Sequence, residues 1–308
     1  MQEPERYLCV DIGGTTGKSG LLTRDGEVIS LWENATADNA AGVVTMLENM
    51  AEEFSPASEP LAGLCVSTTG IVDPWCGKIT DDSKTVIDGY GGVPLREELQ
   101  RRTGLPVEVE NDVNCAALGE YWLGAARNFR NVVCVTVGTG IGGALILDGR
   151  LYRGSRFDAM EVGHIPFFPS DWESRASTRT LIFDYARRAN HLTSELDGRL
   201  VLDRARKGEE AAVRAVEEMC FYLAQGMATL FTVLAPDIFV LGGGAADSVD
   251  FLLPRIESHL ERTLEPRFRK DVVIKTAKLG NRAGMIGALR HFLDMKEIRE
   301  NKRKESEI

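Results

Sequence analysis

Short apolar runs alternate with glycine-rich turns in the first thirty residues of the chain. Residues 7–30 contain three such runs, with "GGTTGK" after the first and Asp25-Gly26 after the second. An Asp-Gly pair between apolar runs is a strong signal for a tight hairpin turn. The pattern therefore predicts three consecutive strands joined by two turns.

The same pattern returns in the second half of the chain. The stretch "VTVGTGIGGALILDGRLYRG" contains an apolar run, a Gly/Thr turn, a second run, the pair Asp148-Gly149 and a third run. Similarity between two distant parts of one sequence indicates an internal repeat. We therefore expect two related domains, each with its own glycine-rich hairpin.

Between and after these hairpins, strand and helix patterns alternate, which predicts an α/β fold. Helices are predicted at residues 40–54, 94–104, 112–126, 209–235 and 281–295, a buried strand at 61–74, and further strands at 105–111 and 236–246. The charged tail at 296–308 is predicted to be a solvated, fraying end. We expect a smaller α/β domain at residues 1–112, completed by a C-terminal helix at about 290–308, and a larger one at 113–289.

Neither glycine-rich turn has the context of the motif that it resembles. A phosphate-binding P-loop would need glycine at position 12, which is Ile12, and a helix after it, whereas a hairpin follows. Gly138, Gly140 and Gly143 match a dinucleotide fingerprint, but a strand follows them too. Both turns are better explained as hairpins whose backbone N–H groups wrap phosphate oxygens, with Thr15 and Thr139 adding hydroxyl donors.

Composition narrows the classes of partner. A net charge of −10 disfavours a broad nucleic-acid surface, although backbone N–H groups and magnesium can still hold a nucleotide. Pro236 and Asp237 interrupt the most apolar later stretch, so no membrane span is predicted, and the first strand begins too early for a signal peptide. The six cysteines are scattered without a CxxC pair, which favours reduced core residues and a cytoplasmic location.

Several motifs occur together in a specific order: "DIGGTTGKSG", "ENDVNCAALGEYWLGA", "VGTGIGGALILDGRLYRG", "EVGH" and "LGGG". Over nearly the whole chain they resemble the ROK family of sugar kinases, within the actin/hexokinase-like superfamily. The resemblance implies two actin/ribonuclease H-like α/β domains with a cleft between them. It also implies an ATP- and magnesium-dependent phosphotransferase of glucokinase type, acting on a hexose hydroxyl, most simply the 6-OH.

The resemblance assigns roles to the sugar side of the site. The residues expected to bind sugar are Gly70, Asn111, Asp112, Glu161, His164 and Glu173. Asp112 is the expected catalytic base, because a sugar hydroxyl is a poor nucleophile until a carboxylate orients it and accepts its proton. An Asp at this position would also be a good helix N-cap, and the two roles are compatible.

The nucleotide side of the site is assigned in the same way. The residues expected to bind ATP and its phosphates are Gly13, Gly14, Thr15, Lys18, Thr139, Gly140, Gly243 and Gly244. Asp11 is expected to face Mg²⁺, through water, since magnesium tends to keep its waters. The role of Lys18 stays open between a phosphate contact and an exposed strand residue.

The sequence departs from the family pattern at two places. Family members often carry a cysteine-rich zinc module after "GH", but the segment "IPFFPSDWESRAST" after His164 contains no cysteine, so no zinc site is expected. "WESRAST" nevertheless resembles the stretch that follows the module, which is why Glu173 keeps a sugar role. Met160 stands where the family normally has glycine.

Alternatives remain open for the sugar substrate and for the class of protein. Zinc-less relatives include β-glucoside kinases, and a kinase for N-acetylmannosamine is a second possibility. The family also contains sugar-responsive transcriptional regulators, but the strand from Tyr7 leaves no room for a preceding helix-turn-helix. A non-catalytic sugar- or nucleotide-binding protein is disfavoured by Asp112 and the two hairpins. A homodimer is expected from the family alone.

Overall fold

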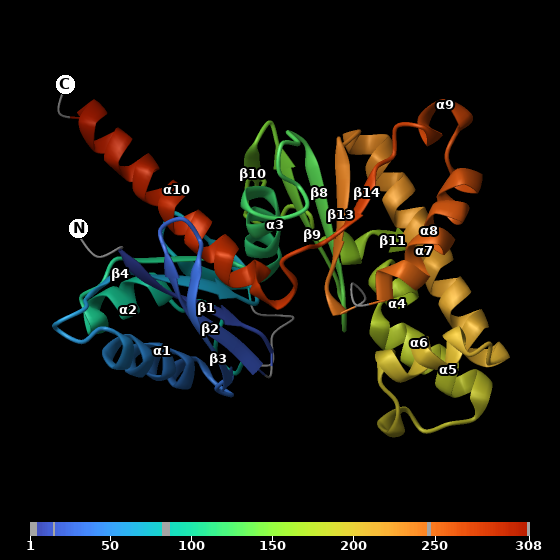
Figure 1. The fold of residues 1–308 in the computed structure, drawn as a ribbon, viewed down its shortest axis with the longest axis horizontal. Helices are drawn as coiled ribbons and strands as arrows, with labels where there is room; N and C mark the ends of the chain where they lie inside the picture. Colours follow the sequence, from blue (N-terminus) through green and yellow to red (C-terminus); the bar gives the residue numbers. More distant parts are fainter. Residues whose placement is uncertain (1–4, 15, 82–86, 245–247, 307–308) are drawn as a thin grey trace. The chain divides into compact units, whose positions relative to one another are not determined.

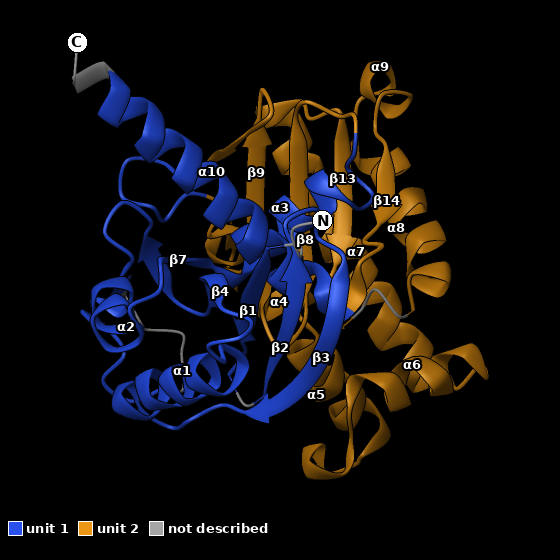
Figure 2. Cartoon of the chain, turned by 60° about the vertical axis from the view of Figure 1, so that its left-hand side comes forward, with its two compact units in different colours: residues 1–127, 153–159, 281–308 blue, residues 128–152, 160–280 orange. Residues whose placement is uncertain are grey.

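The computed structural model describes residues 5–14, 16–81, 87–244 and 248–306. The chain forms two compact units (Figure 2). Unit 1 contains residues 1–127, 153–159 and 281–308, and unit 2 contains residues 128–152 and 160–280. These boundaries differ from the predicted ones, because the helix that follows residue 112 and the whole C-terminal helix belong to unit 1.

Unit 1 is built on a five-stranded sheet of order β3-β2-β1-β4-β7 (Figure 2). β1 (Arg6–Ile12), β2 (Thr16–Thr23) and β3 (Val28–Ala35) form an antiparallel meander, as the sequence predicts. β4 (Leu61–Thr68) and β7 (Val107–Asn111) continue the sheet parallel to β1. The short strands β5 (Ile71–Asp73) and β6 (Lys78–Asp81) pair separately.

Alternating side chains of β1 serve the two faces of this sheet. Leu8, Val10 and Ile12 join the core that includes buried side chains of α1 (Ala40–Phe54) and α2 (Leu95–Thr103). On the opposite face, Tyr7 packs edge-on against Phe292 of α10 (Ala283–Ser306). Asp11 has the parity of Tyr7, so the period-two pattern of a strand directs its carboxylate toward α10.

Two glycines bring α10 close to α3 (Asp112–Trp122). A Cβ on Gly119 would lie 2.5 Å from the carbonyl oxygen of Ala283, and one on Gly287 only 1.6 Å from that of Cys115. The two backbones therefore touch where any larger residue would separate them. This contact explains why α3 belongs with the C-terminal helix in unit 1, rather than with the chain that follows it.

Unit 2 repeats the topology of unit 1, with sheet order β10-β9-β8-β13-β14 (Figure 1). β8 (Val132–Val137), β9 (Ile141–Leu147) and β10 (Arg150–Tyr152) form the meander, and β13 (Ile238–Gly242) and β14 (Ile274–Thr276) run parallel to β8. The predicted internal repeat is thus present in the order and direction of the strands. A small hairpin, β11 (Pro166–Phe167) and β12 (Ser170–Asp171), lies outside this sheet.

Helices cover the unit 2 sheet, and the long α7 (Glu210–Leu234) supplies much of the core. The others are α4 (Glu173–Ala176), α5 (Thr178–Ala189), α6 (Gly198–Arg206), α8 (Val249–Thr263) and α9 (Pro266–Arg269). Short 3-10 helices lie at Val162–His164, Thr193–Glu195 and Gly280–Arg282. Val133, Val135 and Val137 of β8 belong to the same core, which fixes the face that this strand presents to the helices.

The charged C-terminal stretch differs from its prediction. α10 continues to Ser306, and Arg299 within it donates from Nε to Glu108 Oε1 on β7 at 2.9 Å. The stretch is therefore helical and partly docked. Among the described residues, no helix combines the length and the hydropathy that crossing a membrane requires. Five cysteines are buried, and Cys76 is exposed.

Candidate active site

The predicted catalytic base lies at a sharp corner between β7 and α3. β7 ends at Asn111 and α3 begins at Asp112, with no residue between them. The N-cap of α3 is Asn111, whose Oδ1 accepts from the backbone N–H groups of Val113 and Asn114. Asp112 therefore occupies the first helical position instead of the cap, and its Oδ1 accepts from Val113 N at 2.9 Å.

Asn111 also fixes the neighbouring loop. Its Nδ2 donates to the carbonyl oxygen of Gly70 and to Asp112 Oδ1, both at 3.0 Å. Gly70 has a φ of 90°, a conformation that favours glycine. The Asn111 amide thus connects the loop after β4 to Asp112. This same amide is expected from the sequence to contact the sugar, but here it already donates to two protein oxygens.

Asp11 is the next-to-last residue of β1, at the same edge of the unit 1 sheet. It lies opposite Ser67 of β4, whose hydroxyl donates to Asp11 Oδ1. A Cβ on Gly284 in the first turn of α10 would lie 2.4 Å from the Asp11 carboxylate. Burial raises the pKa of Asp11, against the lowering effects of the Ser67 hydrogen bond and the Lys18 charge. A cation at this carboxylate would offset the cost of burying it.

The first glycine turn connects β1 to β2. The Gly13 carbonyl accepts from Thr36 Oγ1 at 2.8 Å, and a Cβ on Gly13 would lie 2.7 Å from the Thr16 carbonyl oxygen. Gly14 is exposed, and Thr15 lies outside the described residues. Lys18 is the direct cross-strand partner of Asp11, so both side chains are on the same face of the sheet.

Asp11, Gly70 and Asp112 come from the carboxyl ends of adjacent parallel strands, β1, β4 and β7. In α/β folds, ligands bind outside these carboxyl ends. The structure therefore gathers the predicted unit 1 residues at one sheet edge, although they are far apart in sequence.

Unit 2 gathers its predicted nucleotide residues in the corresponding place. In the turn between β8 and β9, Gly138 N donates to the Gly140 carbonyl at 2.9 Å, and Thr139 is exposed. Gly243 follows β13 with a φ of 82°, and a Cβ there would lie 2.5 Å from the Val137 carbonyl oxygen. Gly244 is exposed, and an added Cβ would meet nothing within 4 Å.

Glu161 and His164 lie at the two ends of one short turn. The Glu161 carbonyl accepts from His164 N at 3.1 Å, and both side chains are exposed. His164 Nδ1 lies 4.0 Å from Asp171 Oδ2. Hydrogen bonds from Ser174, with a smaller contribution from His164, hold the pKa of Asp171 below its usual range.

Met160, the departure from the family glycine, has a left-handed backbone with a φ of 69°. Such a backbone explains why glycine suits this position. The Met160 side chain packs against the hydrophobic core of unit 2. The substitution therefore adds core contacts at the cost of a strained backbone.

Glu173, the first residue of α4, reaches the second glycine turn. Its Oε2 accepts from Ile141 N at 2.9 Å, and an added Cβ on Gly140 would lie 2.3 Å from the same oxygen. The carboxylate is also close to Gly163, where an added Cβ would lie 3.2 Å from it. Glu173 thus braces the turn at Gly140 against the turn that carries Glu161 and His164.

A tryptophan anchors the segment that lacks the zinc module. Trp172 is fully buried, its Nε1 donates to the Tyr222 carbonyl at 2.8 Å, and its ring occupies the space left by Gly226 of α7. Trp172 directly precedes Glu173, so this packing holds α4 in place. In the described parts of the chain, no three His, Cys, Asp or Glu side chains group as metal ligands.

We expect the purified protein to carry no stoichiometric zinc. Elemental analysis after dialysis against metal-free buffer measures this directly. The matched control is the same preparation incubated with zinc before dialysis, which should lose the added metal. One tightly bound zinc per chain in either sample would contradict the prediction.

Sequence reasoning missed several residues that shape the site, among them Ser67, Glu110, Arg153 and His291. Ser67 directly follows an apolar run, where a polar residue is itself a signal, whereas Glu110 stands between Val109 and Asn111 and gave no such signal. Arg153 and His291 gave no comparable signal, because their importance depends on tertiary contacts with Glu110.

The two glycine-rich hairpins, the repeated sheet topology and Asp112 at the junction of β7 and α3 are typical of two-unit α/β phosphotransferases. The family model named ROK family matches residues 7–294, and the chain belongs to this family. It is 32% identical to a glucokinase of Streptomyces coelicolor, covering 91% of this chain and 95% of that protein. It is 31% identical to a β-glucoside kinase of Listeria monocytogenes, covering 94% and 97%.

A solved structure supports the same assignment of fold. The Streptomyces griseus ROK glucokinase, in complex with glucose and AMPPNP, matches with a TM-score of 0.81 and 30% identity. The match covers 92% of this chain and 98% of that one. The predicted fold class, two related α/β units of actin-like type, is thereby confirmed.

Proposed function

We propose that this protein is an ATP-dependent hexose kinase of glucokinase type that phosphorylates the 6-hydroxyl group. The observation that carries the proposal is the placement of Asp112 at the carboxyl edge of the same sheet as Asp11 and the first glycine turn. Related proteins of known activity, a glucokinase and a β-glucoside kinase, are similar over almost the whole chain. Both transfer a phosphoryl group to a sugar.

Asp112 acts as the general base in this proposal. Its carboxylate is partly exposed and is oriented by Val113 N and Asn111 Nδ2. An oriented carboxylate can hold the sugar hydroxyl in line with the γ-phosphoryl group and accept its proton as the new bond to phosphorus forms. Glu161, His164 and Glu173 are proposed to select the sugar through hydroxyl contacts.

The glycine turns are proposed to hold the phosphates of ATP through backbone N–H groups. The residues proposed for this role are Gly13, Gly14, Thr15, Thr139 and Gly140, and Gly243 and Gly244 are proposed to admit the adenosine. Asp11 suits Mg²⁺, because it is a half-buried carboxylate whose burial a cation would offset. Bound magnesium would neutralise phosphate charge, and Lys18, on the same face as Asp11, is proposed to add a second positive charge.

The test is an ADP-release assay across a panel of glucose, mannose, N-acetylmannosamine and a methyl β-glucoside. We expect glucose to give the highest kcat/KM, with measurable activity on near neighbours, because small differences in a pocket discriminate only modestly. The matched control is 6-deoxyglucose, which should not stimulate ADP release.

Two outcomes would contradict the proposal in different ways. No sugar-stimulated ADP release from any hexose would exclude the kinase function. Preference for N-acetylmannosamine or the β-glucoside would keep the reaction and replace the substrate. A cytoplasmic location and a homodimer are parts of the same proposal that come from the family resemblance, and light scattering on the purified protein measures the dimer.

A further inference from the structure

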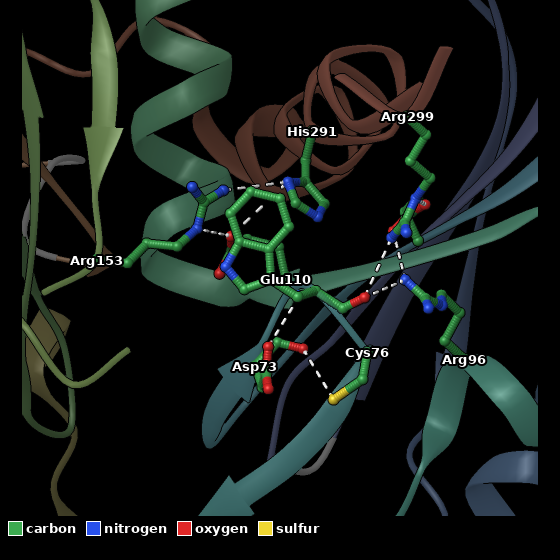
Figure 3. Close-up of polar contacts among 9 residues, drawn as sticks. Asp73, Cys76, Arg96, Glu110, Arg153, His291 and Arg299 are labelled. Carbon is green, nitrogen blue, oxygen red and sulfur yellow. Dashed lines mark hydrogen bonds and ion pairs between the residues drawn. The ribbon is translucent and has the colours of Figure 1, made fainter. Parts of the chain in front are cut away.

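Three segments of unit 1 meet at one buried carboxylate. Glu110 is the next-to-last residue of β7, and its side chain is 1% exposed. Arg153 donates from Nε to Glu110 Oε2 at 2.6 Å, and His291 of α10 places Nδ1 3.7 Å from the same oxygen. Figure 3 shows these side chains converging from different parts of the chain.

The second oxygen of Glu110 holds the corner from which Asp112 projects. Glu110 Oε1 accepts from the backbone N–H of Asn111 at 2.9 Å and from Asn114 Nδ2 at 3.1 Å. One contact lies just before Asp112 and the other just after it. Because no loop separates β7 from α3, a carboxylate that bonds to both sides of the corner fixes its geometry.

The charges of the cluster agree with this arrangement. Burial alone would raise the pKa of Glu110, but Arg153, followed by His291 and the two N–H donors, holds the pKa below its usual value. Burial lowers the pKa of His291 to about 4; Glu110 opposes this change and Arg153 adds to it. His291 is then neutral at pH 7, and its Nδ1 accepts from Arg153 Nη2 at 3.3 Å. Glu110 stays ionised with Arg153 as its close cation.

A second acid–arginine pair on the same strand provides a natural comparison. Glu108 lies two residues before Glu110, so both side chains are on the same face of β7. Glu108 accepts from Arg299 at 2.9 Å and from Arg96 at 3.5 Å, and Figure 3 labels the two arginines. The recorded hydrogen bonds of Glu108 go to these arginines, whereas those of Glu110 also reach Asn111 and Asn114 of the corner. The two pairs thus share strand, face and charge, and differ in their contact with the α3 corner.

We propose that Arg153 and Glu110 are positioning residues, which set the orientation of Asp112 by bracing the corner between β7 and α3. The inference rests on the proposed function, in which Asp112 is the base. Arg153 contributes from the segment 153–159, which lies in sequence between two parts of unit 2 and belongs to unit 1. Arg153, which lies outside the motif "ENDVN", therefore controls the geometry of that motif.

The first test compares kinetics of Glu110→Gln and Arg153→Met with the matched variants Glu108→Gln and Arg299→Met. We expect kcat to fall roughly 100-fold in the first two with little change in KM, because a small misplacement of a catalytic group costs about this much. Arg153→Lys should recover part of kcat, since it restores the charge. The Glu108 and Arg299 variants should keep wild-type kcat.

The second test asks whether Glu110 acts through Asp112. In an Asp112→Asn background, adding Glu110→Gln should cause no further loss of kcat, because the group that it positions has already been removed. A full additional loss would show that Glu110 affects activity by another route and would overturn the proposal. Wild-type kcat in both Glu110→Gln and Arg153→Met would overturn it as well.

The third test needs no enzymatic activity. Hydrogen exchange at the amides of residues 111–114 should accelerate in Arg153→Met and remain unchanged in Arg299→Met. Arg153 is 21% exposed, so its variants remain usable if Glu110→Gln fails to fold. If the wild type phosphorylates no sugar, the proposed function fails. The exchange rates still show whether Arg153 and Glu110 hold the corner between β7 and α3 in place. Equal exchange in wild type and Arg153→Met would overturn it.

Discussion

Replacing Asp112 with asparagine should lower kcat by roughly 10²- to 10⁴-fold, the range that a general base contributes. The asparagine Oδ1 can still accept from Val113 N and Asn111 Nδ2, so the first turn of α3 keeps its contacts. What the variant loses is the ability to accept a proton from the sugar hydroxyl. Steady-state kinetics with saturating ATP and sugar measure the effect, and thermal melting checks the fold.

The matched control is Glu97→Gln, which removes an exposed carboxylate from α2 of the same unit. It should leave kcat and the melting temperature unchanged. If Asp112→Asn retained wild-type kcat with a normal melting curve, Asp112 would not be the base. The phosphoryl acceptor would then have to be activated by another group.

Replacing Trp172 with alanine should destabilise unit 2 by about 3–5 kcal/mol, the usual cost of removing a large buried aromatic side chain. The indole is fully buried, packs where Gly226 leaves room, and satisfies the Tyr222 carbonyl. Its loss leaves a cavity against α7 and removes the indole hydrogen bond to the Tyr222 carbonyl. Chemical denaturation of the full chain, followed by near-ultraviolet circular dichroism, measures the change.

Phe168→Ala is the matched control for Trp172, because Phe168 is an aromatic residue of the same segment that is 97% exposed. This variant should unfold like the wild type. Adding EDTA or zinc should shift neither curve, because we expect the buried Trp172 to anchor this segment without a metal. Equal stability of Trp172→Ala and wild type would show that the segment is anchored by other contacts.

Much of the fold follows from local patterns in the sequence. Asp25-Gly26 and Asp148-Gly149 fix hairpin turns that need few distant contacts, so both meanders could be predicted with their order. The parallel strands at 61–68 and 238–242 were identifiable as apolar runs, and the one at 107–111 as an alternation of valine and glutamate. Their alignment then gathers Asp11, Gly70 and Asp112 at one sheet edge.

What the sequence could not supply depends on contacts between distant segments. The N-cap of α3 is Asn111 instead of Asp112. Both residues can cap a helix, and which of them does so depends on the exact residue at which β7 ends. The boundary after residue 112 was displaced because Gly119 and Gly287 let α3 and α10 touch. The charged tail was expected to be solvated, yet Arg299 pairs with Glu108, 191 positions away in sequence.

The distribution of cysteines has a practical consequence for spectroscopy. Cys76 is exposed in the segment between β5 and β6, while the other five thiols are buried. A maleimide dye or spin label should therefore attach at Cys76 without prior mutagenesis. Partial desolvation of the exposed thiol and the nearby Asp73 raise the pKa of Cys76, so coupling should proceed faster at mildly alkaline pH, where more thiolate is present. The native chain thus offers a single reporter on unit 1, ready for measurements of motion during turnover.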